Sequence, residues 1–198
     1  MKKIVLVNPP FVYFPGNDRS RYNYCRPPLG ICYLASYLLE YSPGGFEIEI
    51  VDTLVERKSF GGWCREIADK QPDIVGFSTV TPTINESARM AVEIRRLCPG
   101  AVLVAGGPHC TVRPEDALPA FDAAVAGEGE QTFLELALAV EKGDSWDHID
   151  GLVFAGDNGN VRHNSPRDFI RPLDDIPPPA RHLLRSDAYY HSFPYRHR

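Results

Sequence analysis

Small and hydroxyl-bearing residues follow the short apolar segments of this 198-residue chain, and they are its main candidates for chemistry. Glycine lets a backbone approach a ligand closely, and serine and threonine hydroxyls both donate and accept hydrogen bonds. The stretches that follow the apolar segments are Asn8–Phe14, Asp52–Glu56, Ser78–Thr83, Gly106–Cys110 and Gly127–Glu130. Because they carry few charges, they favour a large, mostly uncharged ligand over a triphosphate.

Several common catalytic motifs are missing from the sequence. The first of these turns reads Asn8-Pro9-Pro10-Phe11, where a dinucleotide-binding fold carries Gly-x-Gly-x-x-Gly. The chain has no Gly-Lys-Ser/Thr phosphate loop, no Gly-x-Ser-x-Gly nucleophile elbow and no Cys-x-x-Cys pair. Ser78 and Gly127 stand where a phospho-accepting receiver needs an aspartate and a lysine. The pattern therefore indicates binding through backbone and hydroxyl groups.

Alternating strands and helices must position these segments. Apolar runs typical of buried parallel strands lie at Ile4–Asn8, Phe46–Asp52, Asp73–Thr79, Ala101–Ala105 and Ala123–Ala126. Helical spacing of apolar residues predicts helices at 29–41, 62–70, 84–94, around 114–119 and 131–141. Thr83 and Glu86 form a capping-box pattern at the start of the third helix. Five β-α units predict an α/β fold, a flavodoxin-like doubly wound parallel five-stranded sheet of order 2-1-3-4-5.

The remainder of the chain extends this domain. Leu152–Ala155 and Asn160–His163 flank a Gly-Asp-Asn-Gly turn and predict an added C-terminal β-hairpin. We therefore predict an α/β domain over residues 1–145 and a hairpin extension of it over 146–165. The 18 prolines cluster towards both ends of the chain. They predict a long irregular loop over 9–28 and a proline-rich connector over 166–198.

The composition argues against several partners and locations. With 21 Lys+Arg against 26 Asp+Glu the net charge is −5, so the chain lacks the basic surface of a general nucleic-acid binder. No apolar run approaches the roughly 20 residues of a membrane helix, and the N-terminal run is too short for a signal peptide. Five irregularly spaced cysteines indicate reduced thiols, so we expect a cytoplasmic protein with no nucleic-acid or membrane partner.

Ser78 followed by Gly106-Gly107 resembles the later part of the cobalamin-binding signature, which reads Asp-x-His-x-x-Gly, Ser-x-Leu/Thr and Gly-Gly. Nearly the whole chain is similar to the N-terminal domains of cobalamin-dependent radical S-adenosylmethionine (radical SAM) proteins. Within them it resembles the branch that includes the anaerobic magnesium-protoporphyrin IX monomethyl ester cyclase. The matching stretches are Asn8–Pro10, Pro27–Ala35, Asp73–Ser78, Gly106–His109 and Gly127–Glu130, and Pro172–Arg181 resembles the connector to the radical barrel.

The resemblance implies a cobalamin-binding domain, with the cofactor on the carboxyl edge of the sheet and its nucleotide tail beside Ser78, Thr79 and the Gly106-Gly107 turn. The cofactor-binding residues that it implies are Asn8, Pro9, Pro10, Ser78, Thr79, Val80, Thr81, Gly106, Gly107, Pro108, His109, Gly127, Glu128 and Gly129. It implies no catalytic or metal-binding residue in this chain. The first turn lacks Asp-x-His-x-x-Gly, so that loop supplies no histidine as a lower cobalt ligand.

The resemblance also implies a larger enzyme. Relatives bind a 4Fe-4S cluster and S-adenosylmethionine through a Cys-x-x-x-Cys-x-x-Cys run, which this chain lacks. We therefore expect a non-catalytic domain of a longer oxidoreductase, cyclase or methyltransferase. Its radical SAM barrel would follow on the same polypeptide and act on a small organic substrate. The domain would position cobalamin for methyl transfer or another radical transformation.

Simpler interpretations of the same residues stay open. Gly106-Gly107 could form only a tight turn, and Gly127–Glu130 could only cap the last helix. Ser78 could be an ordinary strand-end hydroxyl, and His109 could bond only within its loop. The aromatic residues of the 9–28 loop could cover a corrin face or pack on their own domain. The alternative function is a flavodoxin-like domain that no longer binds cobalamin and acts as a substrate-docking or interaction module.

Overall fold

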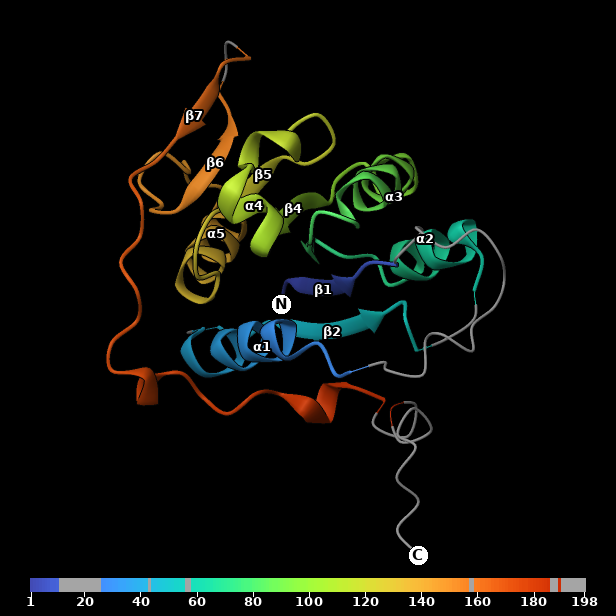
Figure 1. Cartoon of the computed structure of the whole chain (residues 1–198), viewed down its shortest axis with the longest axis horizontal. Coiled ribbons are helices and arrows are strands. Elements are labelled where there is room, and N and C mark those ends of the chain that lie inside the picture. The colour runs from blue at the N-terminus through green and yellow to red at the C-terminus, as the bar shows by residue number, and fades with distance from the viewer. Residues whose placement is uncertain (11–25, 43, 56–57, 157–158, 186–188, 190–198) are drawn as a thin grey trace, which may run out of the picture.

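The computed structural model describes residues 1–10, 26–42, 44–55, 58–156, 159–185 and 189. Within them the strands form one seven-stranded sheet of order β2-β1-β3-β4-β5-β6-β7 (Figure 1). The strands are β1 (Lys3–Asn8), β2 (Glu47–Asp52), β3 (Ile74–Ser78), β4 (Val102–Gly106), β5 (Ala123–Val125), β6 (Leu152–Ala155) and β7 (Val161–His163). The first five are parallel and the last two antiparallel, which confirms the predicted fold with its C-terminal hairpin.

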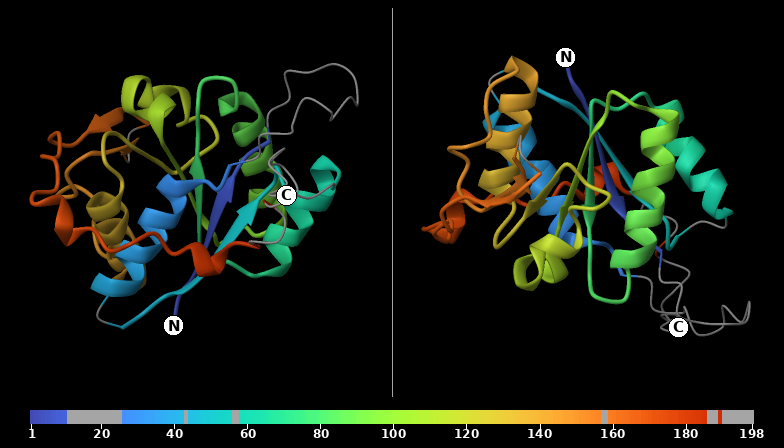
Figure 2. Two further views of the ribbon diagram at one scale, coloured as in Figure 1. Left: turned by 60° about the horizontal axis from the view of Figure 1, so that its bottom comes forward. Right: turned by 90° about the horizontal axis from the view of Figure 1, so that it is seen from above.

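Helices cover both faces of this sheet. They are α1 (Leu29–Tyr41), α2 (Phe60–Asp69), α3 (Ile84–Leu97), α4 (Pro108–Val112) and α5 (Glu130–Lys142). Helices α1 and α5 lie together on one face, and α2 and α3 lie together on the other (Figure 2). No helix of the described residues has the length and apolar character needed to cross a membrane.

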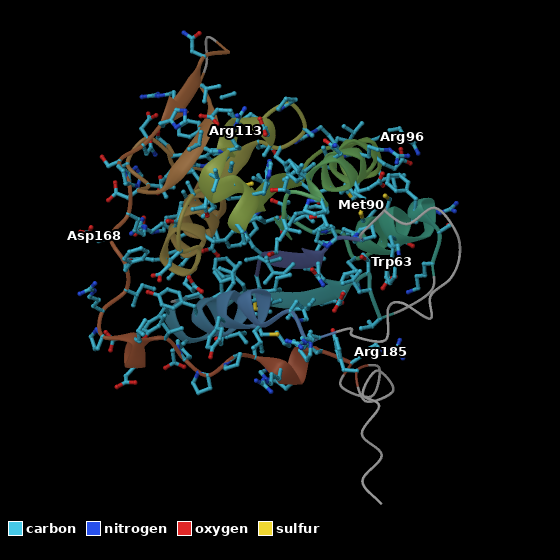
Figure 3. The ribbon with its side chains drawn as sticks, viewed as in Figure 1. Trp63, Met90, Arg96, Arg113, Asp168 and Arg185 are labelled. Atoms are coloured by element: carbon cyan, nitrogen blue, oxygen red, sulfur yellow. The ribbon has the colours of Figure 1, made fainter. Side chains whose placement is uncertain are left out.

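The central strand β1 shows why an unbroken apolar run suits this position. Ile4 and Leu6 pack under α1 and α5, whereas Val5 and Val7 pack under α2 and α3. Successive side chains of a strand point to opposite faces, so a strand covered on both sides must be apolar throughout. The α2–α3 side includes Trp63 (Figure 3).

Two local predictions were wrong. Thr83 precedes α3, but its hydroxyl accepts a hydrogen bond from the Val80 N–H at 3.0 Å and makes no cap bond to the helix. The backbone of Thr83 is helical (φ −109°, ψ −11°) rather than extended, so the capping box with Glu86 does not form. The helix predicted around 114–119 is instead α4, which begins at Pro108, where the fixed φ of proline suits a first helical turn. Only a short 3₁₀ turn, Pro114–Asp116, occupies the predicted place.

Residues 166–185, here called the strap, lie along the outside of α5 and α1 (Figure 1). The Arg167 guanidinium donates to the Thr132 hydroxyl at 2.8 Å and to the Asp150 carbonyl at 3.2 Å, and also bonds the Glu135 carboxylate. Ile170 N–H donates to the Glu128 carboxylate at 3.1 Å. These bonds tie the first part of the strap to α5 and to the loop before it.

The second part of the strap follows α1. The Tyr41 hydroxyl donates to the Asp175 carbonyl at 2.7 Å, and Ala180 N–H donates to the Cys32 carbonyl at 3.0 Å. Ala180 is buried against the core on this side. The described part of the predicted connector is therefore packed on the domain, and its continuation into a barrel stays a prediction.

Candidate functional site

A cavity, here called the slot, opens at the carboxyl edge of the parallel strands, on the face covered by α1 and α5. Its volume is about 260 Å³. Its floor has an inner rung of apolar or glycine residues and an outer rung nearer the strand ends. The inner rung is Leu6, Gly76 and Val104, and the outer rung is Ser78, Gly106 and Val125. The walls are Gly30, Ile31 and Leu34 of α1, Glu130 and Phe133 of α5, and the turns at Gly107-Pro108 and Gly127–Gly129.

Three glycines keep the mouth of the slot open. A Cβ added to Gly106 would have Val125 as its nearest neighbour at 3.7 Å, and one added to Gly129 would meet Val125 at 3.9 Å. A Cβ on Gly127 would meet nothing within 4 Å, although the φ of +92° there already favours glycine. Side chains at these positions would therefore reduce the open space of the slot rather than collide with the protein.

Gly107 has a different role, because it brings α4 against the end of β3. Its φ of +92° and ψ of −175° lie in a region that only glycine adopts readily. A Cβ there would lie 2.8 Å from the Thr79 carbonyl oxygen and 3.2 Å from the Ser78 hydroxyl. The glycine pair thus combines an open position at Gly106 with a close contact at Gly107.

Thr79 is fully buried and does not line the slot. Its N–H and its hydroxyl both donate to the Gly106 carbonyl, at 2.7 and 2.9 Å. The hydroxyl also lies 3.3 Å from the Cys110 sulfur, and burial raises the pKa of that thiol. Thr79 therefore joins the ends of β3 and β4 and holds α4 against them.

His109 of α4 also lies outside the slot lining. Its Nδ1 is 3.1 Å from the Thr81 hydroxyl, and its backbone N–H donates to the Thr79 carbonyl at 3.2 Å. Its buried Nε2 lies 3.3 Å from the Asp116 carboxylate but makes no hydrogen bond there. These contacts connect the β3–α3 turn to α4.

Asn8, at the end of β1, faces β2 rather than the slot. Its side-chain amide donates to the Asp52 carboxylate at 2.9 Å. That buried carboxylate also accepts the Leu54 N–H at 3.0 Å and the Tyr189 hydroxyl at 2.6 Å. Pro9, Pro10 and Val80 do not line the slot either, and the rest of the first loop, 11–25, lies outside the described residues.

Two carboxyl groups stand at the mouth of the slot. Glu128 lines it and is held by the N–H of Ile170 in the strap. Glu130 is the first residue of α5, and burial raises the pKa of its carboxyl group. The turn at Gly127–Glu130 thus starts a helix, as the simpler interpretation has it, and also forms one wall of the slot.

The predicted site residues therefore fall into two groups, those that line the slot and those that lie outside its lining. Those that line the slot are Ser78, Gly106, Gly107, Pro108, Gly127, Glu128 and Gly129. The lining residues that the sequence did not point to are mainly those of the inner rung and the side chains beside it, including Gly76 and Phe133. Period-two alternation back from Ser78 could have found Gly76, whereas Phe133 depends on how α5 packs.

Comparison with known proteins agrees with this geometry. The model of a family described as the B12 binding domain matches residues 19–137, which include the lining turns that follow β3, β4 and β5. The chain belongs to the B12-binding domain family. This membership confirms the resemblance that the Ser78 and Gly106-Gly107 positions indicate.

Relatives of this B12-binding domain are parts of longer proteins. An uncharacterized methyltransferase, PH0819, of Pyrococcus horikoshii is 38% identical over 166 residues, which cover 82% of this chain and 35% of the relative. The anaerobic magnesium-protoporphyrin IX monomethyl ester cyclase of Rubrivivax gelatinosus is 33% identical over 159 residues, which cover 77% of this chain and 28% of the relative. The chain spans about a third of the length of these relatives.

A solved structure shares the fold of the B12-binding domain. The radical S-adenosylmethionine methyltransferase TsrM of Kitasatospora setae, solved with cobalamin and a 4Fe-4S cluster bound, matches with a TM-score of 0.67 and 26% identity. The match covers 90% of this chain and 31% of TsrM. The chain thus resembles one domain of a cobalamin-dependent radical SAM enzyme.

Proposed function

We propose that this domain binds cobalamin and positions it for a radical SAM enzyme that carries out methyl transfer or another radical transformation of a small organic substrate. The observation that carries the proposal is the slot. It is an apolar cavity at the carboxyl edge of a B12-binding fold, and its mouth is formed by glycines. Ligands of doubly wound sheets bind outside this edge.

The residues of the slot fit the nucleotide tail of cobalamin. A cavity of about 260 Å³ has room for a bicyclic aromatic base. A Cβ at Gly106, Gly127 or Gly129 would occupy that space, as expected of glycines that admit a ligand. The Ser78 hydroxyl and the carboxyl groups of Glu128 and Glu130 offer hydrogen bonds to the polar atoms of the tail.

The residues of this chain would bind and orient the cofactor. Cobalamin, when bound, supplies a cobalt centre that can carry a methyl group or take part in radical chemistry. Asn8, Pro9 and Pro10 stand where a ligating histidine loop would be, so we propose that no residue of that turn binds cobalt from below. The 4Fe-4S cluster and S-adenosylmethionine would belong to a barrel domain, as the covered share of TsrM suggests.

The proposal is tested by adding hydroxocobalamin to the purified chain, removing unbound cofactor on a desalting column and recording the visible spectrum. We expect the protein fraction to retain cobalamin with a changed spectrum. Gly106→Val places a side chain in the slot and should abolish retention. Gly100→Ala is the matched control, because its added Cβ meets nothing within 4 Å and lies away from the slot. Loss of retention by the wild-type chain itself would favour the docking-module alternative.

A further inference from the structure

The described residues that line the inner half of the slot bring no hydrogen-bonding side chain to it. Leu6, Gly76 and Val104 form its floor, and the side chains beside them include Leu34 and Phe133. The backbone groups of the inner rung belong to parallel strands that are paired on both sides of β3. A ligand group that enters this half would therefore contact the carbon atoms of these lining side chains.

Phe133 and Gly76 together set the depth of the slot. A Cβ built on Gly76 would lie 2.9 Å from Cε2 of Phe133 and 3.0 Å from Cδ2 of Leu6. The phenyl ring of Phe133 thus reaches the strand backbone at a position where only glycine leaves room for it. The phenyl ring therefore closes the inner end of the slot over Gly76.

Among the described lining residues, polar side chains occur towards the mouth. Ser78 lies two residues beyond Gly76 on the same face of β3, which is about 6.6 Å along the strand. Glu128 and Glu130 lie on the loop and first helical position after β5. The slot therefore has a polar mouth and an apolar interior.

We propose that Gly76, Val104 and Phe133 make this domain selective for cobalamin, whose lower base is an apolar dimethylbenzimidazole, over corrinoids whose lower base is adenine. This inference rests on the proposed function. The two methyl groups of dimethylbenzimidazole match the carbon lining. The exocyclic amine and the additional ring nitrogens of adenine would lose their hydrogen bonds to water there. One buried group left without a partner lowers affinity by about 10- to 100-fold.

The test measures equilibrium dissociation constants of the purified chain for cobalamin, for its adenine-containing analogue pseudocobalamin, and for cobinamide, which lacks the nucleotide. We expect cobalamin to bind at least about tenfold more tightly than pseudocobalamin, because at least one adenine nitrogen is left unpaired. Equal dissociation constants for these two would overturn the selectivity and leave the proposed function standing. Absence of cobalamin binding would instead overturn the proposed function. Binding of cobinamide as tight as that of cobalamin would show that the slot is not used.

A pair of variants assigns the selectivity to the inner rung. Val104→Thr keeps the side-chain shape and adds a hydroxyl group to the slot, so it should reduce the preference for cobalamin over pseudocobalamin. Val102→Thr is the control, because Val102 lies on the same strand and face but does not line the slot. An unchanged preference in a folded Val104→Thr protein would contradict the assignment to Val104. The wild-type comparison stands even if that variant fails to fold.

Discussion

Replacement of Gly107 by alanine tests the geometry of the glycine pair. At φ +92° and ψ −175°, an alanine would occupy a conformation that costs about 1–3 kcal/mol. Its Cβ would lie 2.8 Å from the Thr79 carbonyl oxygen and 3.0 Å from the Thr79 nitrogen. Both are backbone atoms that cannot rotate away, so the end of β3 or the start of α4 must shift, which adds about 1–3 kcal/mol.

We therefore expect Gly107→Ala to lower the free energy of unfolding by about 3 kcal/mol or more, which for a chain of this size lowers Tm by roughly 6–12 °C. Gly106→Ala is the matched control, because its Cβ meets only Val125 at 3.7 Å and its φ is not positive. It should leave the free energy of unfolding within about 0.5 kcal/mol of wild type. Gly127→Ala should fall between the two, because it has the positive φ but no close contact.

Urea denaturation and thermal melts followed by circular dichroism measure all three variants. We expect Gly107→Ala to lose the most free energy of unfolding, Gly127→Ala less, and Gly106→Ala the least. A Gly107→Ala protein as stable as Gly106→Ala would refute it, because the conformation and the close contact assigned to Gly107 would then be wrong.

Three further predictions concern Glu130 at the slot mouth, Arg167 in the strap, and Tyr189. Burial raises the pKa of the Glu130 carboxyl above its ordinary value of 4.5. As pH rises from 4.5 through the native pKa, the free energy of unfolding of the wild type should therefore fall relative to that of Glu130→Gln. Urea titrations measure this difference, which should not change with pH below 4.5. Arg167→Ala should cost about 2–3 kcal/mol and speed proteolysis of the strap. The control Arg162→Ala, whose ion pair with an aspartate is half exposed, should cost less than about 1 kcal/mol. Tyr189→Phe removes one donor from the buried Asp52 carboxylate and should cost about 1–2 kcal/mol in the same assay.

The strand framework could be predicted from sequence because burial on both faces leaves a simple pattern. Ile4–Asn8 is apolar almost throughout, and the structure places it at the centre of the parallel sheet. The carboxyl ends of parallel strands share one edge, so the residues after β3, β4 and β5 were expected together, and Ser78, Gly106 and Gly127 indeed line one slot.

The parts that pattern alone could not give depend on competition between local interactions. Thr83 matched a capping box, but its hydroxyl bonds the backbone of Val80, three residues earlier in the turn. The resemblance places His109 and Thr79 among the cofactor residues, whereas the structure places both outside the slot lining. Because Gly107 lets α4 begin directly after β4, the Thr79 hydroxyl contacts Cys110 of α4 and His109 of α4 contacts Thr81 after β3. Phe133 could not be assigned, because the face of α5 that meets Gly76 follows from packing.

If the slot holds the nucleotide tail of cobalamin, as we propose, the base of that tail would no longer bind the cobalt. Electron paramagnetic resonance of the chain mixed with an equal amount of cob(II)alamin tests this directly, since a nitrogen base on cobalt splits the signal by superhyperfine coupling. We expect a protein-bound signal without nitrogen splitting for the wild type, and the splitting of the free cofactor in the mixture with Gly106→Val. A wild-type sample that keeps the nitrogen splitting of free cob(II)alamin would contradict it.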